Sequence, residues 1–81
     1  MSGNTIWVRM HGHLVRYAGE KTSAFPVPIG AAETLAELVQ RFGIPRAEIS
    51  MIAINGRTET QMDTPLHPDD QVSIFGLVGG G

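Results

Sequence analysis

The sequence contains no cysteine, which excludes disulfide bonds, thiolate metal sites and a thiol nucleophile together. It also contains no run that approaches the roughly 20 apolar residues needed by a membrane-spanning helix. The first residues, Met1 to Asn4, have neither a basic region nor a long apolar stretch, so they do not look like a secretory leader. We therefore expect a cytoplasmic protein that makes no contact with membranes.

Charged residues are scarce as well. They make up 17% of the 81 residues, the net charge is -2, and the isoelectric point is near 5.8. Domains that bind nucleic acids typically present a strong basic field, which is missing here, so we expect no nucleic-acid partner. A hydrophobic content of 42% suits one compact domain, and a chain of this length has no room for a separate catalytic domain.

Two segments near the N-terminus alternate between apolar and polar residues, as half-buried strands do. The first runs from Thr5 to His11 and the second from Ser23 to Ile29, with a turn region over Gly12 to Lys21 between them. Pro26 and Pro28 remove two N–H groups from the same side of the second strand, so we expect it at the edge of a sheet. The residues expected to face inward are Ile6, Val8, Met10, Phe25, Val27 and Ile29.

One amphipathic helix is expected after these strands. Thr34 and Glu37 fit a capping box, in which the Thr34 hydroxyl accepts a hydrogen bond from the Glu37 amide and the Glu37 carboxylate accepts one from the Thr34 amide. Gly43 is expected to end the helix in a left-handed conformation, and Pro45 would prevent its continuation. The apolar residues form one stripe at helical spacing, which consists of Leu35, Leu38, Val39 and Phe42.

The second half of the chain predicts three further strands. Met51 to Ile54 reads as a strand that ends at Asn55-Gly56, a dipeptide typical of two-residue hairpin turns. Arg57 to Thr60 would be a short return strand. After a polar connection in which Leu66 packs under the sheet, Gln71 to Phe75 would form the last strand. A helix between the first hairpin and these strands favours a mixed sheet with one face covered.

This order of elements corresponds to an α+β fold of the β-grasp, or ubiquitin-like, roll. We expect a mixed four- to five-stranded sheet with one main helix packed on one face. In the known topology of this roll, the first and last strands are parallel neighbours at the centre of the sheet. Residues 1–75 would form the β-grasp domain, and residues 76–81 a flexible glycine-rich tail that leaves from the middle of the sheet.

The sequence ends on three glycines, Gly79 to Gly81, soon after an apolar strand. Glycine has no Cβ, so such a run can lie extended in a channel that is too narrow for side chains. The five residues from Leu77 to the terminal carboxylate could span about 17 Å when extended. We interpret this segment as one that is inserted into a partner, although a frayed terminus would have a similar composition.

Four stretches follow one another along the chain: Thr34 to Leu38, Ile52 to Arg57, Thr64 to Phe75, and the terminal Gly80-Gly81. Each is common alone, but their order, the chain length and the Gly-Gly end are specific in combination. Together they resemble the MoaD/ThiS family of ubiquitin-like sulfur carriers over nearly the full length. Family members often carry prolines between the last strand and the tail, where this chain has Gly76-Leu77, so we expect a looser tail here.

The resemblance implies chemistry at the C-terminal carboxylate, with the protein as a carrier and substrate and not as an enzyme. An adenylyltransferase of the ubiquitin-activating type would use ATP to adenylate Gly81, and a sulfur donor protein would then allow conversion to a thiocarboxylate. A side chain at Gly80 or Gly81 would crowd the acyl carbon, so these two residues form the expected reactive site. The chain itself would bind no cofactor. The large subunit of a molybdopterin synthase would be a further partner.

Partner binding also requires a surface near the tail. If Val72 and Ile74 face the helix, aromatic and apolar side chains remain on the open face of the sheet, where an exposed apolar patch commonly marks a partner site. Loops or a dimer contact that covered this face would be the alternative. The expected partner-binding residues are Trp7, Met51 and Phe75 on the sheet, together with Leu77, Val78 and Gly79 in the tail.

The remaining polar residues give weaker signals. His11 and His13 lie on the same side of an extended segment, and His67 could join them on a metal ion. Without cysteine or a paired carboxylate nearby, we interpret them as solvated loop histidines and expect no metal site. Asp69-Asp70 follows a proline and is read as turn chemistry.

Four functions therefore remain open. The first is a sulfur carrier for cofactor biosynthesis, most similar to the small subunit of molybdopterin synthase, and the second is a carrier for the thiazole pathway of thiamine. The third is a protein modifier that is conjugated to lysines through Gly81. The fourth is a β-grasp interaction module whose tail is never activated.

Overall fold

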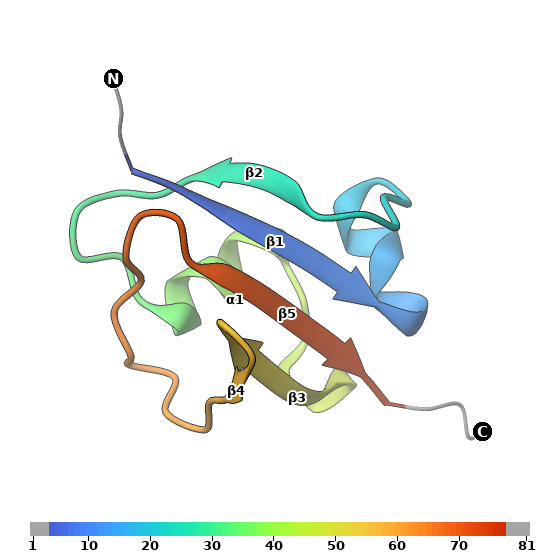
Figure 1. Cartoon of the computed structure of the whole chain (residues 1–81). Helices are drawn as coiled ribbons and strands as arrows, with labels where there is room; N and C mark the ends of the chain where they lie inside the picture. Colours follow the sequence, from blue (N-terminus) through green and yellow to red (C-terminus); the bar gives the residue numbers. More distant parts are fainter. Residues whose placement is uncertain (1–3, 78–81) are drawn as a thin grey trace.

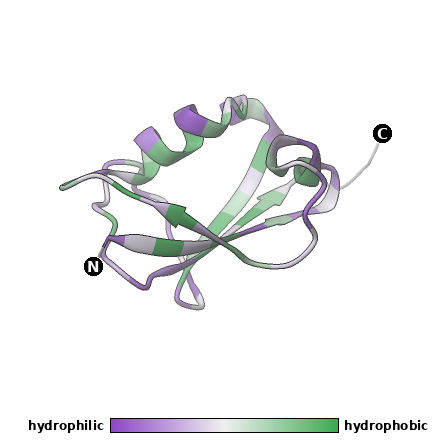
Figure 2. Cartoon of the chain, turned by 90° about the horizontal axis from the view of Figure 1, so that it is seen from above, coloured by the Kyte–Doolittle hydropathy of each residue, from purple (hydrophilic) through white to green (hydrophobic). Residues whose placement is uncertain are grey.

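The computed structural model describes residues 4–77, which form one five-stranded sheet with a single α-helix across one face (Figures 1 and 2). In chain order the elements are β1 (Thr5–His11), the 3₁₀ helix η1 (Gly12–Ala18), β2 (Phe25–Pro28), α1 (Leu35–Phe42), the 3₁₀ helix η2 (Arg46–Glu48), β3 (Ile49–Ile54), β4 (Arg57–Thr58) and β5 (Gln71–Gly76). Among these residues, no helix is long and apolar enough to cross a lipid bilayer.

The strands are arranged in the order β2-β1-β5-β3-β4. β1 and β5 run parallel at the centre, and every other pair is antiparallel, so the sheet is mixed as predicted (Figure 1). β2 lies at the edge, where Pro26 stands opposite Trp7 and Pro28 opposite Thr5. This position confirms the prediction from the two prolines. Proline has no N–H group, and an edge strand needs no hydrogen bonds to a second neighbouring strand.

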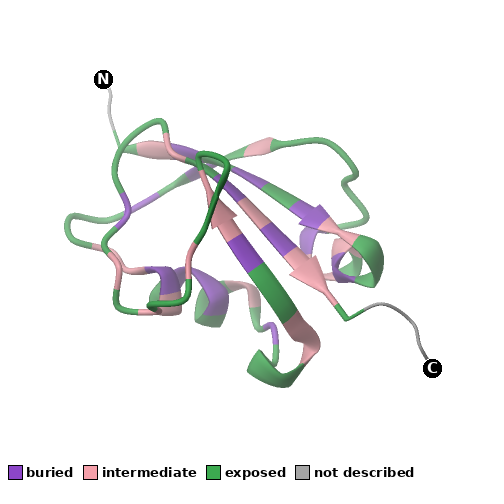
Figure 3. Ribbon diagram, turned by 60° about the horizontal axis from the view of Figure 1, so that its bottom comes forward, coloured by how far each residue is buried: buried purple, intermediate pink, exposed green. Residues whose placement is uncertain are grey.

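The core lies between the sheet and α1. Alternate residues of the strands point toward the helix, and the apolar stripe of α1 faces them, so that buried and exposed segments alternate along the strands (Figure 3). Phe25 is only half-buried, and its ring meets Phe42 edge-on with the centroids 6.0 Å apart. The largest fully buried side chains are Ile6, Val8, Met10, Leu14, Leu35, Leu38, Val72 and Ile74.

The ends of α1 follow the predicted signals. Thr34 accepts a hydrogen bond from the Glu37 amide at 3.3 Å, and Glu37 accepts one from the Thr34 amide at 2.8 Å, which completes the capping box. Gly43 ends the helix with a φ of 73°. The next two amides of the first turn, at Leu35 and Ala36, donate to the carbonyls of Thr64 and Met62. The connection before β5 therefore caps the helix as well, and it buries Leu66 as expected.

Several boundaries differ from the predictions. β2 is limited to Phe25–Pro28 and β4 to Arg57–Thr58, both shorter than expected, because neither pairs further along its neighbour. β3 starts earlier, at Ile49, and β5 continues through Gly76. The largest difference is the segment from Gly12 to Ala18, which is a 3₁₀ helix and not only a turn. Its Leu14 and Ala18 are buried, so this helix closes one end of the core.

Candidate functional site

The tail originates at the end of the central strand β5, between β1 and β3 (Figure 1). β5 extends one residue beyond the predicted Phe75, and Leu77, the next residue, is 53% exposed. The expected tail residues Val78, Gly79, Gly80 and Gly81 lie outside the described residues, so their roles remain predictions. What the structure describes is the surface from which the tail departs.

Gly76 and Leu77 are held from the side of β3. The Leu77 amide donates to the Glu48 carbonyl at 3.2 Å, and the Ser50 hydroxyl donates to the Gly76 carbonyl at 3.0 Å. Ser50 is also the extra residue of a β-bulge, because Ile49 stands opposite Gly76 while Met51 stands opposite Phe75. The bulge therefore places a serine hydroxyl beside the last carbonyl of the strand. The sequence offered no signal for this arrangement.

The inner side of Gly76 is covered by η1. A Cβ atom built at Gly76 would lie 2.9 Å from Leu14 Cγ, closer than Cβ atoms approach a neighbour, and 3.1 Å from His13 Cε1, a tight contact. Leu14 is fully buried, so it has no free space into which to retreat. Gly76 is thus a packed residue, whose missing side chain lets η1 lie directly against the strand.

A polar cluster not predicted from the sequence lies beside Gly76. The Tyr17 hydroxyl donates to Glu48 Oε1 at 2.9 Å, and His13 Nε2 lies 3.4 Å from the same oxygen. The hydrogen bond to the Glu48 carboxylate raises the pKa of Tyr17, because it stabilises the protonated phenol. These contacts connect η1 to η2 on the two sides of the strand end. We call Tyr17, His13 and Glu48 the polar bridge.

The open face of the sheet carries an apolar patch next to the tail. The rings of His11 and Phe75 are stacked, with their centroids 4.1 Å apart and their planes 11° from parallel. Met51 stands opposite Phe75 on β3 and is 38% exposed. Burial, and then the neighbouring Arg9, lower the pKa of His11, which favours the neutral form of its ring. We call His11, Met51 and Phe75 the tail-exit patch.

Trp7 lies on the same face but apart from this patch. It is 42% exposed and stands beside Gln71, whereas Phe75 stands beside His11, four residues further along β1. At the usual rise per residue this separation is about 13 Å. Arg9 and Ser73 form the row between them, so the structure separates Trp7 from the other two predicted sheet residues. The role of Trp7, Met51 and Phe75 in partner binding remains a prediction.

The acidic turn before β5 has the structural role expected of it. Asp70 accepts hydrogen bonds from the His67 amide at 2.8 Å and from Asn55 Nδ2 at 2.9 Å. His67 itself is exposed. Among residues 4–77, no group of three or more histidine, aspartate or glutamate side chains is close enough to hold a metal ion.

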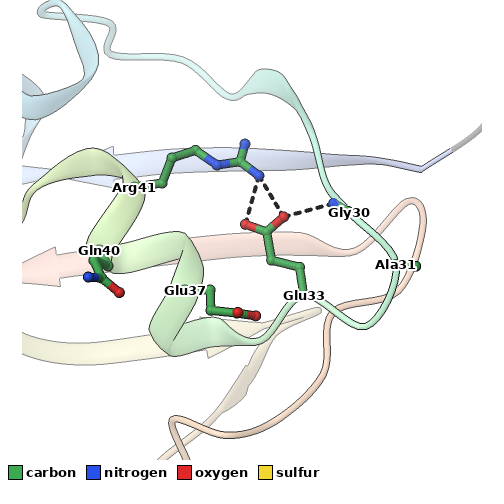
Figure 4. Close-up of a pocket in the computed structure, with 6 residues that line it drawn as sticks. All are labelled: Gly30, Ala31, Glu33, Glu37, Gln40 and Arg41. Atoms are coloured by element: carbon green, nitrogen blue, oxygen red, sulfur yellow. Dashed lines mark hydrogen bonds and ion pairs between the residues drawn. The ribbon is translucent and has the colours of Figure 1, made fainter.

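A hollow of about 450 Å³ lies between α1 and the loop that precedes it (Figure 4). Glu33 and Arg41 form an ion pair across it at 2.6 Å, and Glu33 also accepts a hydrogen bond from the Gly30 amide at 2.8 Å. Arg41 further donates to the Pro28 carbonyl at 2.6 Å. Because these groups satisfy one another, their evident role is to connect α1 to β2. The residues that line the hollow are Gly30, Ala31, Glu33, Glu37, Gln40 and Arg41.

Solved structures with the same fold were found by comparison. Small archaeal modifier protein 1 from H. volcanii has a TM-score of 0.72 at 14% identity, covering 94% of this chain and 100% of that one. A protein described as molybdopterin converting factor subunit 1 from Pyrococcus furiosus has a TM-score of 0.73 at 16% identity, with the same coverage. A complex of subunits 1 and 2 of molybdopterin-converting factor from Helicobacter pylori matches with a TM-score of 0.61 at 24% identity, covering 95% of this chain and 99% of that one.

At these identities the structural matches establish the β-grasp fold. No curated protein sequence matches the chain significantly. The profile of the ThiS family, in contrast, matches residues 8–81, from the first strand through the terminal glycines. This match agrees with the motifs of the helix cap, the Asn-Gly turn, the approach to β5 and the Gly-Gly end. The chain therefore belongs to the ThiS family, and it has the ubiquitin-like β-grasp fold.

Proposed function

We propose that the protein is a sulfur carrier whose Gly81 carboxyl group is adenylated and then converted to a thiocarboxylate. The observation that carries this proposal is the family match, which includes the terminal glycines. The geometry supports it, because the segment that leads to these glycines starts from the central strand beside the tail-exit patch, in which Met51 is exposed and His11 and Phe75 are half-buried. A partner that docks on the tail-exit patch would receive the tail directly.

The proposed chemistry explains why the end is made of glycine. A carboxylate is a poor electrophile, so a partner enzyme would first join it to AMP from ATP, with release of pyrophosphate. A hydrosulfide equivalent from the sulfur donor would then attack the acyl carbon, a C–S bond would form and AMP would leave. Side chains at Gly80 or Gly81 would crowd this carbon and the channel that leads to it. The folded domain presents the tail, while catalysis belongs to the partners.

The acceptor that fits best is the large subunit of a molybdopterin synthase. The support is the similarity to subunit 1 in the Helicobacter pylori complex with subunit 2. In that role the protein would be the small, non-catalytic subunit of a two-subunit enzyme, located in the cytoplasm with the other proteins of the pathway. Its tail would carry sulfur into the active site of the large subunit.

A second candidate function is protein modification. The similarity to small archaeal modifier protein 1 favours it, and the activation step would be the same. The two functions differ in the nucleophile that attacks the activated Gly81, which is a sulfur donor in one case and a lysine amine in the other. They are therefore distinguished by their products.

Intact mass spectrometry of the untagged protein tests the proposal. The protein would be incubated with the adenylating enzyme of the same organism, ATP, Mg²⁺ and a sulfur donor. We expect a mass increase equal to the exchange of one oxygen for one sulfur, located at Gly81 by fragmentation. A chain without Gly81 is the control and should stay unmodified. Isopeptide adducts on lysines would favour the modifier, and an unchanged terminus would contradict both functions.

A further inference from the structure

The last residue of β5, Gly76, has a neighbouring strand on only one side. β1 ends at His11, which stands opposite Phe75, so Gly76 pairs only with Ile49 of β3. A strand end with one neighbour tends to fray, because its free side exposes backbone groups to water. Gly76 and Leu77 nevertheless keep a defined path between η1 and η2. Another set of contacts must hold them there.

Glu48, which lies in η2, contacts both the end of β5 and η1. Its backbone carbonyl accepts the hydrogen bond from the Leu77 amide, while its carboxylate accepts one from the Tyr17 hydroxyl. His13 adds an ion pair to the same oxygen when it is protonated, and its ring lies over the position where Gly76 lacks a side chain. The polar bridge therefore spans the strand end on its inner side. Glu48 thus contacts both η1 and Leu77, the residue from which the tail continues.

From this geometry we infer that Tyr17 and Glu48 are positioning residues for the tail. This inference rests on the proposed function and deepens it. The polar bridge keeps Gly76 and Leu77 in one direction before the partner binds, so that less conformational freedom is lost when the tail enters its channel. The pair of Tyr17 and Glu48 carries most of this effect, because the His13 pair is solvent-exposed and such pairs contribute little.

The contacts of the polar bridge fit this role better than a role in the core. They connect two short 3₁₀ helices at the end of the sheet, whereas the helix–sheet core is closed by apolar side chains alone. Loss of the Tyr17 hydroxyl would leave the ring packed against that core. Its specific consequence would be a wider range of directions for the tail. A binding-competent direction would then be populated in a smaller fraction of molecules, which weakens apparent affinity in proportion.

The Tyr17→Phe variant tests this inference in two independent measurements. The first is hydrogen exchange of the Leu77 amide by NMR, which needs no partner. We expect exchange to become faster by about tenfold in Tyr17→Phe, since the Glu48 carbonyl loses its fixed position. Amides of the paired centre, such as those of Val8 and Ile74, should keep their rates. Unchanged exchange at Leu77 would overturn the inference.

The second measurement is the ATP–pyrophosphate exchange catalysed by the adenylating enzyme of the same organism. We expect Tyr17→Phe to raise the KM for the carrier by roughly tenfold and to leave kcat unchanged, because the enzyme holds the tail once it is bound. Thr34→Ala is the matched control. It removes a hydrogen bond from the helix cap, and it should lower stability without changing the KM or the exchange at Leu77.

The outcomes separate the inference from the proposed function. A faster Leu77 exchange with an unchanged KM would show that the polar bridge holds the strand end but does not serve the partner, and would overturn the positioning role. An equal rise of KM in Thr34→Ala would also overturn it, since general destabilisation would then explain the effect. If the unaltered protein were never adenylated, the proposed function would fall and the effect on KM with it, while the exchange rates would still decide whether the polar bridge holds Leu77.

Discussion

Gly76 and Gly30 have ordinary backbone conformations, but their surroundings differ. A Cβ atom at Gly76 would meet Leu14 Cγ at 2.9 Å, whereas at Gly30 the nearest atom would be Glu33 Oε1 at 3.9 Å. We expect Gly76→Ala to lower the free energy of unfolding by about 1–3 kcal/mol, because a buried leucine must move. Gly30→Ala should change it by less than about 0.5 kcal/mol. Urea denaturation measures both, and equal effects would show that η1 yields freely.

This difference between glycines was not visible in the sequence. Gly76 precedes the glycine-rich end and was assigned to the tail for that reason. A packed glycine and a free one look alike in a sequence when the residues that surround them are distant along the chain, as His13 and Leu14 are from Gly76. The polar bridge was missed for the same reason, since nothing in the local pattern connects Tyr17 with Glu48. The predicted reactive residues Gly80 and Gly81 lie beyond the described residues and still depend on the proposed chemistry.

At the scale of the elements, local signals were sufficient for β1 and α1. The alternation from Thr5 to His11 and the capping box at Thr34 act within a few residues, and both elements have the predicted bounds. Non-local pairing decided the rest. β2 and β4 are short because their neighbours limit them, and the segment of η1 was read as a turn because glycines flank it. Its helical form depends on packing of Leu14 and Ala18 under the sheet.

The hairpin turn between β3 and β4 does more than reverse the chain. Asn55 has a φ of 53°, which few residues adopt without strain, and its side chain contacts the start of β5. Asn55 Nδ2 donates to Asp70 Oδ1, and Asn55 Oδ1 accepts from the Gln71 amide, both at 2.9 Å. The turn type was predicted from Asn-Gly, but these two hydrogen bonds were not. They fasten the turn to the central strand.

We expect Asn55→Ala to lower the free energy of unfolding by about 2 kcal/mol, because it removes both hydrogen bonds and leaves a Cβ in a left-handed conformation. Asn55→Gly is the matched control. It also removes the hydrogen bonds but relieves the conformation, so it should cost about 1 kcal/mol less than alanine. Chemical denaturation of the three proteins gives these differences. Equal losses in the two variants would mean that the conformation carries no strain.

At the scale of the whole molecule, the two faces of the sheet have different roles. α1 covers one face (Figure 2). The other face presents the tail-exit patch together with the more distant Trp7. Both ends of this open face offer an exposed apolar side chain. Met51 lies near the tail and Trp7 does not. A partner that holds the tail must cover the surface from which the tail leaves, so it would contact Met51 first.

Two charge substitutions on this face should therefore differ in effect. We expect Met51→Glu to weaken binding to the adenylating enzyme by about tenfold or more, the scale of a contact in the centre of an interface, and Trp7→Glu to weaken it less. Both side chains are exposed, so melting temperatures should change little. Titration calorimetry with each variant measures the affinities. A larger loss for Trp7→Glu would place the partner over the opposite end of the sheet.

The position of β5 also has a consequence for protein synthesis. The strand that carries the tail is inserted between β1 and β3, so neither the N-terminal hairpin nor the later hairpin can join the sheet without it. A shortened product that stops before Gln71 leaves both halves with unpaired edges, which is the state that aggregates or is degraded. Folding thus acts as a test of length, and the domain can assemble around its central strand only in molecules long enough to have made the segment that leads to the tail.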